Sequence, residues 1–258
     1  MSFGPPSPCC DPDYIEQIVN NAATSNGWTV QKKALRWLID DSCKCGRTDC
    51  WDDAQYIQRY ILATFYYSTN GDKWETCSQP SNIRSQQQCR LGDRSQYANQ
   101  NGFKWLTCND ECGWGGLSCE SGSDGSITDD ITRMDMAENN VGGQLPKEVA
   151  ALNELQILSF EAREQGTFKR NKIGGPIPAE YSGLTKLLLF DMDDNELTGP
   201  LPDFSGIPDI QQIDLNNNEL DETIVGKGLD KLQRLTFLDL SYNSFVGPID
   251  VQSQVLGK

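Results

Sequence analysis

The chain has 258 residues, with 37 acidic and 22 basic side chains and a formal net charge of −15. This balance argues against binding to nucleic acid or to an anionic membrane surface, because both call for basic patches. No apolar run approaches the length of a membrane span, and the length leaves room for two modest domains.

The chain contains no histidine. This removes the commonest general base and every Ser-His or Cys-His nucleophile arrangement. Paired carboxylates such as Asp191 and Asp214 exist, but a solvated strand face offers no apolar pocket that would raise a pKa. We therefore expect no enzymatic activity and no catalytic residue.

All ten cysteines lie between residues 9 and 119. Such confinement indicates disulfide stapling of an N-terminal region in an oxidising compartment. Zinc is the alternative, since residues 43–50 hold three thiols, but their spacing is not that of a standard finger. Five cysteines precede residue 51 and five follow residue 76, so complete pairing within the chain requires at least one bridge between the groups. We expect no metal site and an extracellular or cell-surface location.

Two helices are expected in the N-terminal half. Residues 31–40 place Ala34, Leu35, Leu38 and Ile39 on one face of a short amphipathic helix. A second helix begins after Asp52 or Asp53, either of which is a suitable N-cap, and ends at Asn70-Gly71.

One eight-residue motif recurs through the second half. It begins at Asn139, Asn171, Asn195 and Asn243, with a degenerate copy at Asn218, and carries Gly at plus four and an apolar residue at plus six in most copies. Apolar residues precede each Asn by eleven, eight, five and three positions. A single unit cannot bury these residues alone, so stacked neighbours must share one core. The repeated Asn is expected to turn the chain and to hydrogen-bond the backbone of adjacent turns.

This pattern resembles the plant-type leucine-rich repeat, with five units over residues 129–258. The octet that begins at Cys112 matches the Cys-x-Trp-x-Gly-x-x-Cys cap of such proteins. The resemblance implies a Cys112–Cys119 disulfide and a capping role for Trp114. Residues 34–38 and 58–74 also look like the leader of algal, especially diatom, leucine-rich repeat proteins, which implies a surface or secreted recognition domain.

The expected fold is an α/β solenoid, a right-handed leucine-rich repeat arc with a parallel concave sheet behind a disulfide-stapled, mainly helical cap region. We divide the chain into a Cys-rich helical extension (1–53), a capping region (54–128) and five repeats (129–258). The chain departs from the algal class in its extra cysteines, in a polar insertion around 77–103 and in an insertion within the second repeat.

Outward strand positions on the concave face form a column of acidic residues. Parallel strands lie about 4.8 Å apart, and like charges at this spacing repel by roughly 1 kcal/mol per exposed pair. A cationic partner, Ca²⁺ or local hydrogen bonds must offset this, although Leu-Asp-Leu is also ordinary in the repeat family. Ca²⁺ needs six or more oxygens, which a flat strand face supplies poorly, so no cofactor is assigned. The candidate ligand-binding residues of this face are Asp135, Asp191, Asp193, Asp214 and Asp239.

The insertion at 163–170 places three cations and an aromatic ring beside this face. Loops on a rigid scaffold are favoured binding sites, and Arg with aromatics is typical of interface hot spots; the alternative is a solvated loop that pairs with Glu161 or Asp191. The candidate residues are Arg163, Phe168, Lys169 and Arg170. In the last repeat Phe237 and Tyr242 also face outward, and they extend the site or pack against a further repeat.

The sequence favours a non-catalytic recognition module, an ectodomain or secreted protein. It would bind a protein, peptide or glycan through the concave face and the 163–170 loop, and a cationic ligand is one option. The alternatives are a structural subunit of an extracellular or lumenal assembly and a secreted enzyme inhibitor. The last repeat lacks capping cysteines, and solenoids need covered ends, so either more chain or another molecule is expected to cover it.

Overall fold

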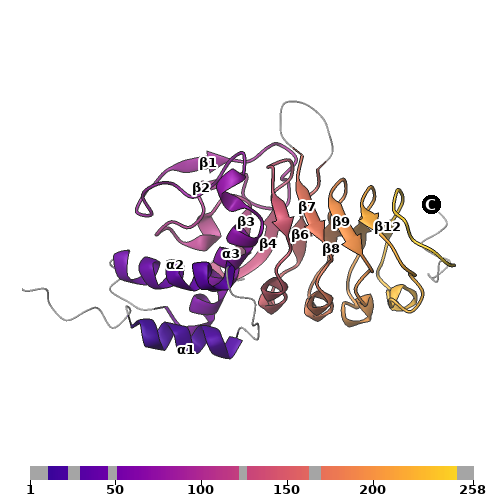
Figure 1. Cartoon of the computed structure of the whole chain (residues 1–258), viewed down its shortest axis with the longest axis horizontal. Coiled ribbons are helices and arrows are strands. Elements are labelled where there is room, and N and C mark those ends of the chain that lie inside the picture. Colours follow the sequence, from indigo (N-terminus) through magenta and orange to yellow (C-terminus); the bar gives the residue numbers. More distant parts are fainter. Residues whose placement is uncertain (1–10, 23–29, 46–50, 122–126, 163–169, 249–258) are drawn as a thin grey trace, which may run out of the picture.

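A computed structural model describes residues 11–22, 30–45, 51–121, 127–162 and 170–248. Helices occupy the N-terminal half, and strands stack side by side from the middle of the chain toward the C-terminal end (Figure 1). The α-helices are α1 (Pro12–Ala22), α2 (Val30–Lys44) and α3 (Asp53–Ser68). The 3₁₀ turns are η1 (Gly71–Lys73), η2 (Glu111–Gly113), η3 (Lys147–Ala151), η4 (Ala179–Gly183), η5 (Phe204–Gly206) and η6 (Leu229–Lys231).

The described strands form three sheets. A two-stranded ribbon pairs β1 (Gln88–Arg90) with β2 (Asn101–Phe103) antiparallel. A six-stranded sheet has the order β12-β10-β8-β6-β4-β3, and a four-stranded sheet has the order β11-β9-β7-β5. Their strands are β3 (Leu117–Ser121), β4 (Ile127–Asp135), β5 (Gly142–Gln144), β6 (Ile157–Ser159), β7 (Lys172–Gly175), β8 (Leu189–Asp191), β9 (Glu196–Gly199), β10 (Gln212–Asp214), β11 (Glu219–Leu220) and β12 (Phe237–Asp239).

Each strand of the six-stranded sheet from β4 to β12 pairs in parallel with its neighbour, and β3 pairs antiparallel with β4. In each short repeat strand the middle residue points inward: Leu158 lies opposite Phe190, which lies opposite Ile213. All three are at most 2 % exposed, and each such burial contributes about 2 kcal/mol. The expected α/β leucine-rich-repeat-like fold with parallel strands is therefore confirmed.

The backbone conformation explains why glycine recurs four residues after the repeated Asn. Gly199 adopts φ +77°, and its equivalents in three other copies adopt φ of +72° to +88°. This left-handed region costs L-residues with a side chain roughly 1 kcal/mol or more. In the degenerate copy the same position is Glu222, which adopts φ +66°. The degenerate copy therefore keeps the left-handed backbone conformation, although glutamate disfavours it.

The repeated Asn side chains form a ladder between coils, as predicted. The Oδ1 atom of Asn195 accepts a hydrogen bond from the Ile173 N–H at 3.0 Å, and its Nδ2 donates to the Phe160 carbonyl at 2.9 Å. Asn171, Asn218 and Asn243 make the equivalent contacts to their preceding coils. These side chains satisfy backbone groups that would otherwise be buried without partners.

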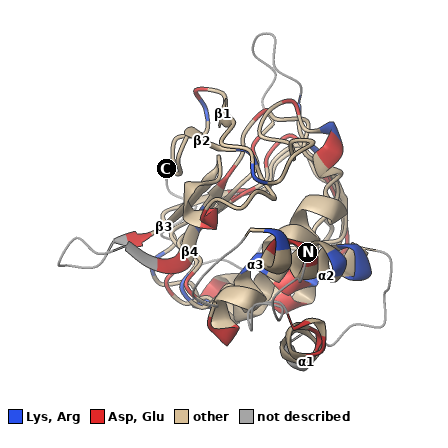
Figure 2. Ribbon diagram, turned by 90° about the vertical axis from the view of Figure 1, so that its left-hand side faces the viewer, with Lys and Arg blue, Asp and Glu red and all other residues tan. Residues whose placement is uncertain are grey.

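The N-terminal half is centred on a buried arginine. Arg59 of α3 is fully buried and pairs with Asp41 of α2 at 2.9 Å and with Glu111 at 2.6 Å. Its guanidinium also donates to the carbonyls of Thr107 and Asn109. Its positive charge is surrounded by the rings of Trp37, Trp51 and Trp114, at 4.5–5.4 Å from the ring centroids. Viewed from this end, α1, α2 and α3 lie together on one side and β3 and β4 on the other (Figure 2).

Three disulfides join described residues. Cys112–Cys119, implied by the family resemblance, is present. Cys45–Cys108 joins the two cysteine groups, as the count required, and Cys77–Cys89 closes the segment before β2. Trp114 is fully buried and packs edge-on against Trp37.

The two expected helices are present and a further one was missed. α3 begins after the N-cap Asp52, whose side chain accepts from the Gln55 N–H in a capping box. The unpredicted helix α1 starts at Pro12, directly after Asp11, a combination typical of a helix start. No described helix is long and apolar enough to cross a membrane.

The hydrophobic core continues from the helices into the repeats. The ring centroid of Phe65 in α3 lies 5.2 Å from that of Phe160, which follows β6. The buried residues of both halves form one cluster. The helical half therefore packs against the first coils and holds their strands in place.

Candidate functional site

The outward side of the six-stranded sheet carries two rows of polar residues. Register aligns Asp135, Ser159, Asp191, Asp214 and Asp239 on successive strands, in agreement with the predicted column. A second row lies two residues further along each coil. We call the acidic residues of both rows the acidic face: Asp135, Glu161, Asp191, Asp193, Asp214 and Asp239.

The expectation that this face is solvated is wrong for most of it. Asp135 and Asp193 are fully buried, Asp214 is 2 % exposed and Asp191 is 5 % exposed, whereas Asp239 is half-buried. Burial, together with the charges of Asp193 and Asp214, raises the pKa of Asp191 to about 8. The reasoning that a strand face cannot raise a pKa is therefore also wrong.

Part of the burial comes from the polar insertion, which the sequence did not place. Residues 91–100, here called the covering loop, connect β1 to β2 and pack across the first coils. The Tyr97 N–H donates to Asp135 Oδ2 at 2.6 Å, and Ser95 Oγ accepts from the Ala137 N–H at 3.0 Å. Burial raises the pKa of Asp135 to about 7, and the charge of Glu161 adds to this. Cys77 and Cys89, which precede the covering loop and form a disulfide, were a sequence signal of a folded insertion.

Arg94 of the covering loop binds the acidic side directly. Its Nε lies 3.0 Å from Glu138 Oε1, and its NH1 lies 3.4 Å from Glu161 Oε1. Burial raises the pKa of Glu138, and the Arg94 charge opposes this rise. One guanidinium thus bridges carboxylates from two consecutive coils.

A group of three carboxylates spans this second coil and the third. Glu161, Asp191 and Asp193 each place an oxygen within 4.8 Å of the others. Asp191 Oδ1 accepts from the Asp193 N–H at 3.3 Å, and no cation in the described part of the chain contacts Asp191. One oxygen from each of these three carboxylates is fewer than the six to eight oxygens that Ca²⁺ prefers. The absence of a metal or cofactor stays a prediction.

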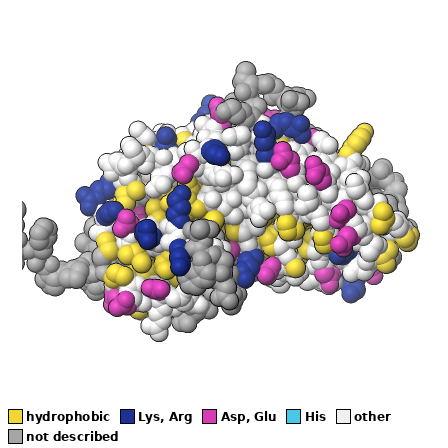
Figure 3. Space-filling view, viewed as in Figure 1, with side chains coloured by type: hydrophobic (Ala, Val, Ile, Leu, Met, Phe, Trp, Pro, Cys, Tyr) yellow, Lys and Arg dark blue, Asp and Glu magenta, His cyan; other side chains and the backbone are white. Residues whose placement is uncertain are grey.

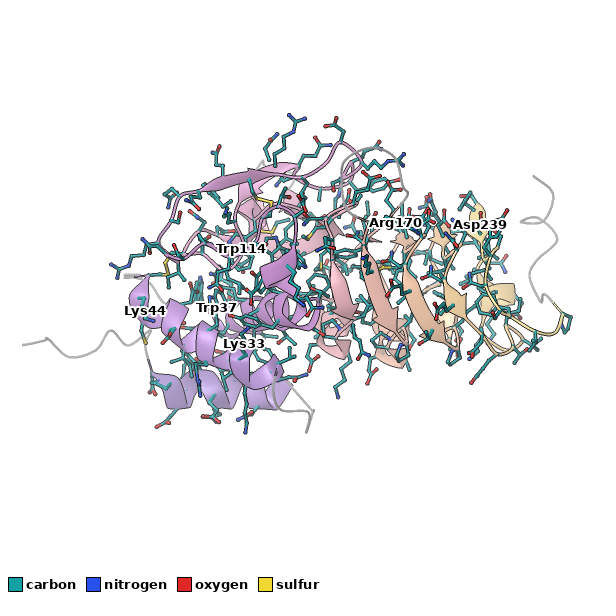
Figure 4. The ribbon with its side chains drawn as sticks, turned by 45° about the horizontal axis from the view of Figure 1, so that its top comes forward. Lys33, Trp37, Lys44, Trp114, Arg170 and Asp239 are labelled. Carbon is teal, nitrogen blue, oxygen red and sulfur yellow. A yellow bond between two sulfur atoms is a disulfide. The ribbon has the colours of Figure 1, made fainter. Side chains whose placement is uncertain are left out.

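Of the second-repeat insertion, only its last residue lies within the described residues. Arg170 NH2 lies 3.2 Å from Asp194 Oδ1 and 3.4 Å from the Asp194 carbonyl. Arg163, Phe168 and Lys169 lie outside the described residues, so their role stays a prediction. Arg170 and Asp239 lie along the same margin of the repeat strands (Figure 4).

The last repeat exposes the aromatic residues that the sequence singled out. Phe237 is 43 % exposed and Tyr242 is 81 % exposed. Tyr242 and the partly buried Leu238 and Leu240 line a hollow of about 420 Å³. In Figure 3 acidic side chains lie on both halves of the visible face, and lysines and arginines lie mainly over the helical half and the middle of the molecule.

Phe237 belongs to a third outward row that sequence reasoning missed. Register aligns it with Gln212, Leu189, Ile157 and Arg133. The period of two along a strand was the available signal, since this row lies two residues before the acidic column. A mixed row, in which three of the five residues are apolar, thus runs beside the acidic rows.

Comparison with known proteins gives partial structural likenesses. No family model matches the sequence, and no curated protein matches it. The ectodomain of the receptor kinase SOBIR1 from Arabidopsis thaliana is 24 % identical with a TM-score of 0.47, over 58 % of this chain and 78 % of that chain. The BIR3–SERK2 complex from the same plant gives 24 % identity and a TM-score of 0.46, over 54 % and 68 %. The HAESA ectodomain from that plant, in complex with a peptide hormone ligand, gives 29 % identity and a TM-score of 0.39, over 43 % and 18 %. None of these three is algal, so the narrower resemblance stays a prediction.

Proposed function

We propose that this chain is a non-catalytic recognition module that binds an extended protein or peptide segment along the outward face of the six-stranded sheet. The main support for this proposal is that the two ends of that face differ in exposure. The covering loop occupies the first coils, whereas Phe237 and Tyr242 are exposed beside Asp239 in the last repeat. Exposed aromatics next to a charged row are typical of interface hot spots.

The disulfides support an oxidising compartment for this activity. Cys45–Cys108, Cys77–Cys89 and Cys112–Cys119 join described residues, and such bonds persist in secreted and cell-surface proteins. We infer an ectodomain or secreted protein. A glycan ligand and a contribution of the 163–170 loop remain part of the same hypothesis.

A site-specific cross-linker tests the surface. A photoreactive benzoylphenylalanine replaces Phe237 in the disulfide-intact chain, and the matched control carries it at Glu219, which is exposed on β11 of the other sheet. We expect a foreign protein from the native secreted and surface fraction to be cross-linked at position 237 alone. Excess unmodified chain should compete it away.

Equal cross-linking at both positions would contradict the proposal. Cross-links of position 237 only to further copies of the chain would instead favour a structural subunit. That second candidate rests on the hollow of the last repeat, which Phe245 and Gly247 help to line, and on Val246 between them, which is 61 % exposed.

A further inference from the structure

The last coil ends in an apolar surface that no other described element covers. Tyr242 is 81 % exposed and Val246 is 61 % exposed, beside the hollow of about 420 Å³ that Leu238, Leu240 and Phe245 help to line. Four of the five large apolar side chains exposed in the described part of the chain lie in the last two coils, and these are Val225, Phe237, Tyr242 and Val246. Contiguous exposed apolar surface marks an interaction site, whereas single exposed side chains do not.

The same end of the molecule has an open strand edge. β12 is the last strand of the stack, at the end away from the helices (Figure 1), and among the described strands it pairs with β10 alone. Phe237 donates its N–H to the Gln211 carbonyl, and the Asp239 carbonyl accepts from the Leu215 N–H, so both residues bond to the preceding coil. Because successive residues of a strand direct their backbone groups to opposite edges, the N–H and C=O of Leu238 point to the open edge. Such an edge is a template for another strand.

The Asn ladder is open here as well. In the preceding coil Asn218 accepts from the Leu197 N–H and donates to the Met192 carbonyl. The equivalent groups of the last coil are the Phe245 N–H and the Leu240 carbonyl, and no Asn of a following coil reaches them in the described part of the chain. The last coil thus presents the surface that each earlier coil buries against its successor. We call this surface, with β12, the hollow, Tyr242 and Val246, the open end.

The charge along β12 favours an antiparallel strand over one more parallel coil. A parallel coil of the same kind would place a further acidic residue opposite Asp239, as Asp191 and Asp214 are already placed. A second copy of β12 that runs antiparallel and pairs at Leu238 places its Asp239 opposite Phe237 instead. Like charges directly opposite each other on a sheet are destabilising. A second copy of this chain therefore fits the edge better than another coil does.

We propose that the open end is an interface between two copies of this chain, related by a two-fold axis, in which the two β12 strands pair antiparallel at Leu238. The same surface then serves on both sides, as in other two-fold dimers. Tyr242 and Val246 of each copy pack against the hollow of the other, and the two six-stranded sheets join into one. The inference goes beyond the proposed recognition function, because it concerns the end of the sheet and needs no ligand on its face.

Sedimentation equilibrium of the full-length, disulfide-intact chain tests the association. We expect a monomer–dimer equilibrium in the micromolar range. Each copy carries a formal net charge of −15, so the copies repel each other at long range. Because salt screens this repulsion, the dimer should tighten several-fold between about 20 mM and about 300 mM salt. A contact held by ion pairs would weaken over the same range.

Matched substitutions locate the interface. Tyr242→Ser removes an aromatic ring from the open end, and Val246→Asp brings a charge into an apolar contact. Each should weaken the dimer about tenfold or more, as expected for the loss of a buried side-chain contact. The control is Tyr14→Ser, which removes a ring that is 47 % exposed on α1 in the other half of the molecule, and it should leave the dimer unchanged. Near-ultraviolet circular dichroism verifies that each variant is folded.

Cysteine substitutions test the register. In the proposed dimer Phe237 of one copy lies opposite Asp239 of the other, within reach of a disulfide. A mixture of Phe237→Cys and Asp239→Cys chains should form a disulfide-linked dimer under mild oxidation, and either chain alone should form much less. Electrophoresis without reductant separates the linked and unlinked chains.

A full-length chain that stays monomeric at every concentration and salt, or equal weakening by Tyr242→Ser and Tyr14→Ser, would overturn the proposal. Equal cross-linking in the mixture and in the single-variant samples would contradict the antiparallel pairing at Leu238. If only a chain shortened to residue 248 dimerises, residues 249–258 occupy the hollow and a second copy does not. Each of these failures leaves the cross-linking of a foreign protein at position 237 to be decided separately.

Discussion

The two halves of this molecule are stabilised in different ways. The half before residue 122 relies on contacts that occur once: a buried arginine between two carboxylates, a cluster of tryptophans and disulfides. The repeat half uses one set of contacts again and again, with an inward apolar residue and an Asn ladder in successive coils. A single substitution should therefore disable the first half and weaken the second only locally.

The largest expected effect is in the helical half. Arg59→Ala leaves Asp41 and Glu111 buried without their shared cation, which costs about 3–5 kcal/mol of unfolding free energy. Chemical unfolding followed by tryptophan fluorescence measures it, since three tryptophan rings lie against Arg59.

A surface arginine provides the control for this comparison. Arg234 pairs with Asp209 at 3.2 Å, but both side chains are at least half exposed. Arg234→Ala should cost less than about 1 kcal/mol. Similar losses for both arginines would show that the buried network is not the centre of the helical half.

Substitutions in the Asn ladder should have an intermediate effect on stability, which is smaller toward the last repeat. Asn195 is 7 % exposed and its amide contacts three carbonyls and one N–H. Asn195→Ala should cost about 2 kcal/mol, because buried backbone groups lose their partners. Asn243 makes equivalent contacts but is only partly buried, so water replaces them and Asn243→Ala should cost less.

Hydrogen exchange tests whether the ladder damage is local. The Ile173 N–H should exchange faster in the Asn195 variant, and the Leu220 N–H in the Asn243 variant, with the helical half unchanged. Uniformly faster exchange throughout the chain would mean that the repeat half unfolds as one unit with the helices.

The smallest effect is a gain of stability. Glu222 holds φ +66° at a position where other copies have glycine. Glu222→Gly removes the cost of a left-handed side-chain residue, offset in part by the greater freedom of glycine in the unfolded chain. We expect about 0.5 kcal/mol of added stability in thermal unfolding. The exchange Gly199→Ala provides the opposite control, since it introduces a side chain at φ +77° and should destabilise.

Sequence reasoning succeeded where a signal was repeated or local. Five Asn copies at near-constant spacing predicted the parallel strands and the ladder, and Asp52 predicted the start of α3. It missed α1, which has only one apolar stripe of Ile15, Ile18 and Val19 and no repeat to support it.

For the candidate site, the sequence predicted that the acidic residues line up across the strands, but it did not predict that they are buried. Their common distance of four residues before the repeated Asn placed Asp191 and Asp214 in one column, and the register agrees. It did not show that both are buried, because burial depends on how segments that are distant in sequence pack together. The roles assigned to Phe237 and Tyr242 stay predictions, although both are exposed as expected.

The sequence by itself determined the repeat period and the inward and outward positions of each coil, whereas the Cys112–Cys119 pair was implied by the family resemblance. These features follow from local geometry and from contacts between units that are copies of each other. Only the tertiary structure decided that Arg94 lies on Glu138 and Glu161, that Arg59 is the centre of the helical half, and that Asp191 is buried. Each of these is a contact between segments with no common pattern, and such contacts depend on how the whole chain packs.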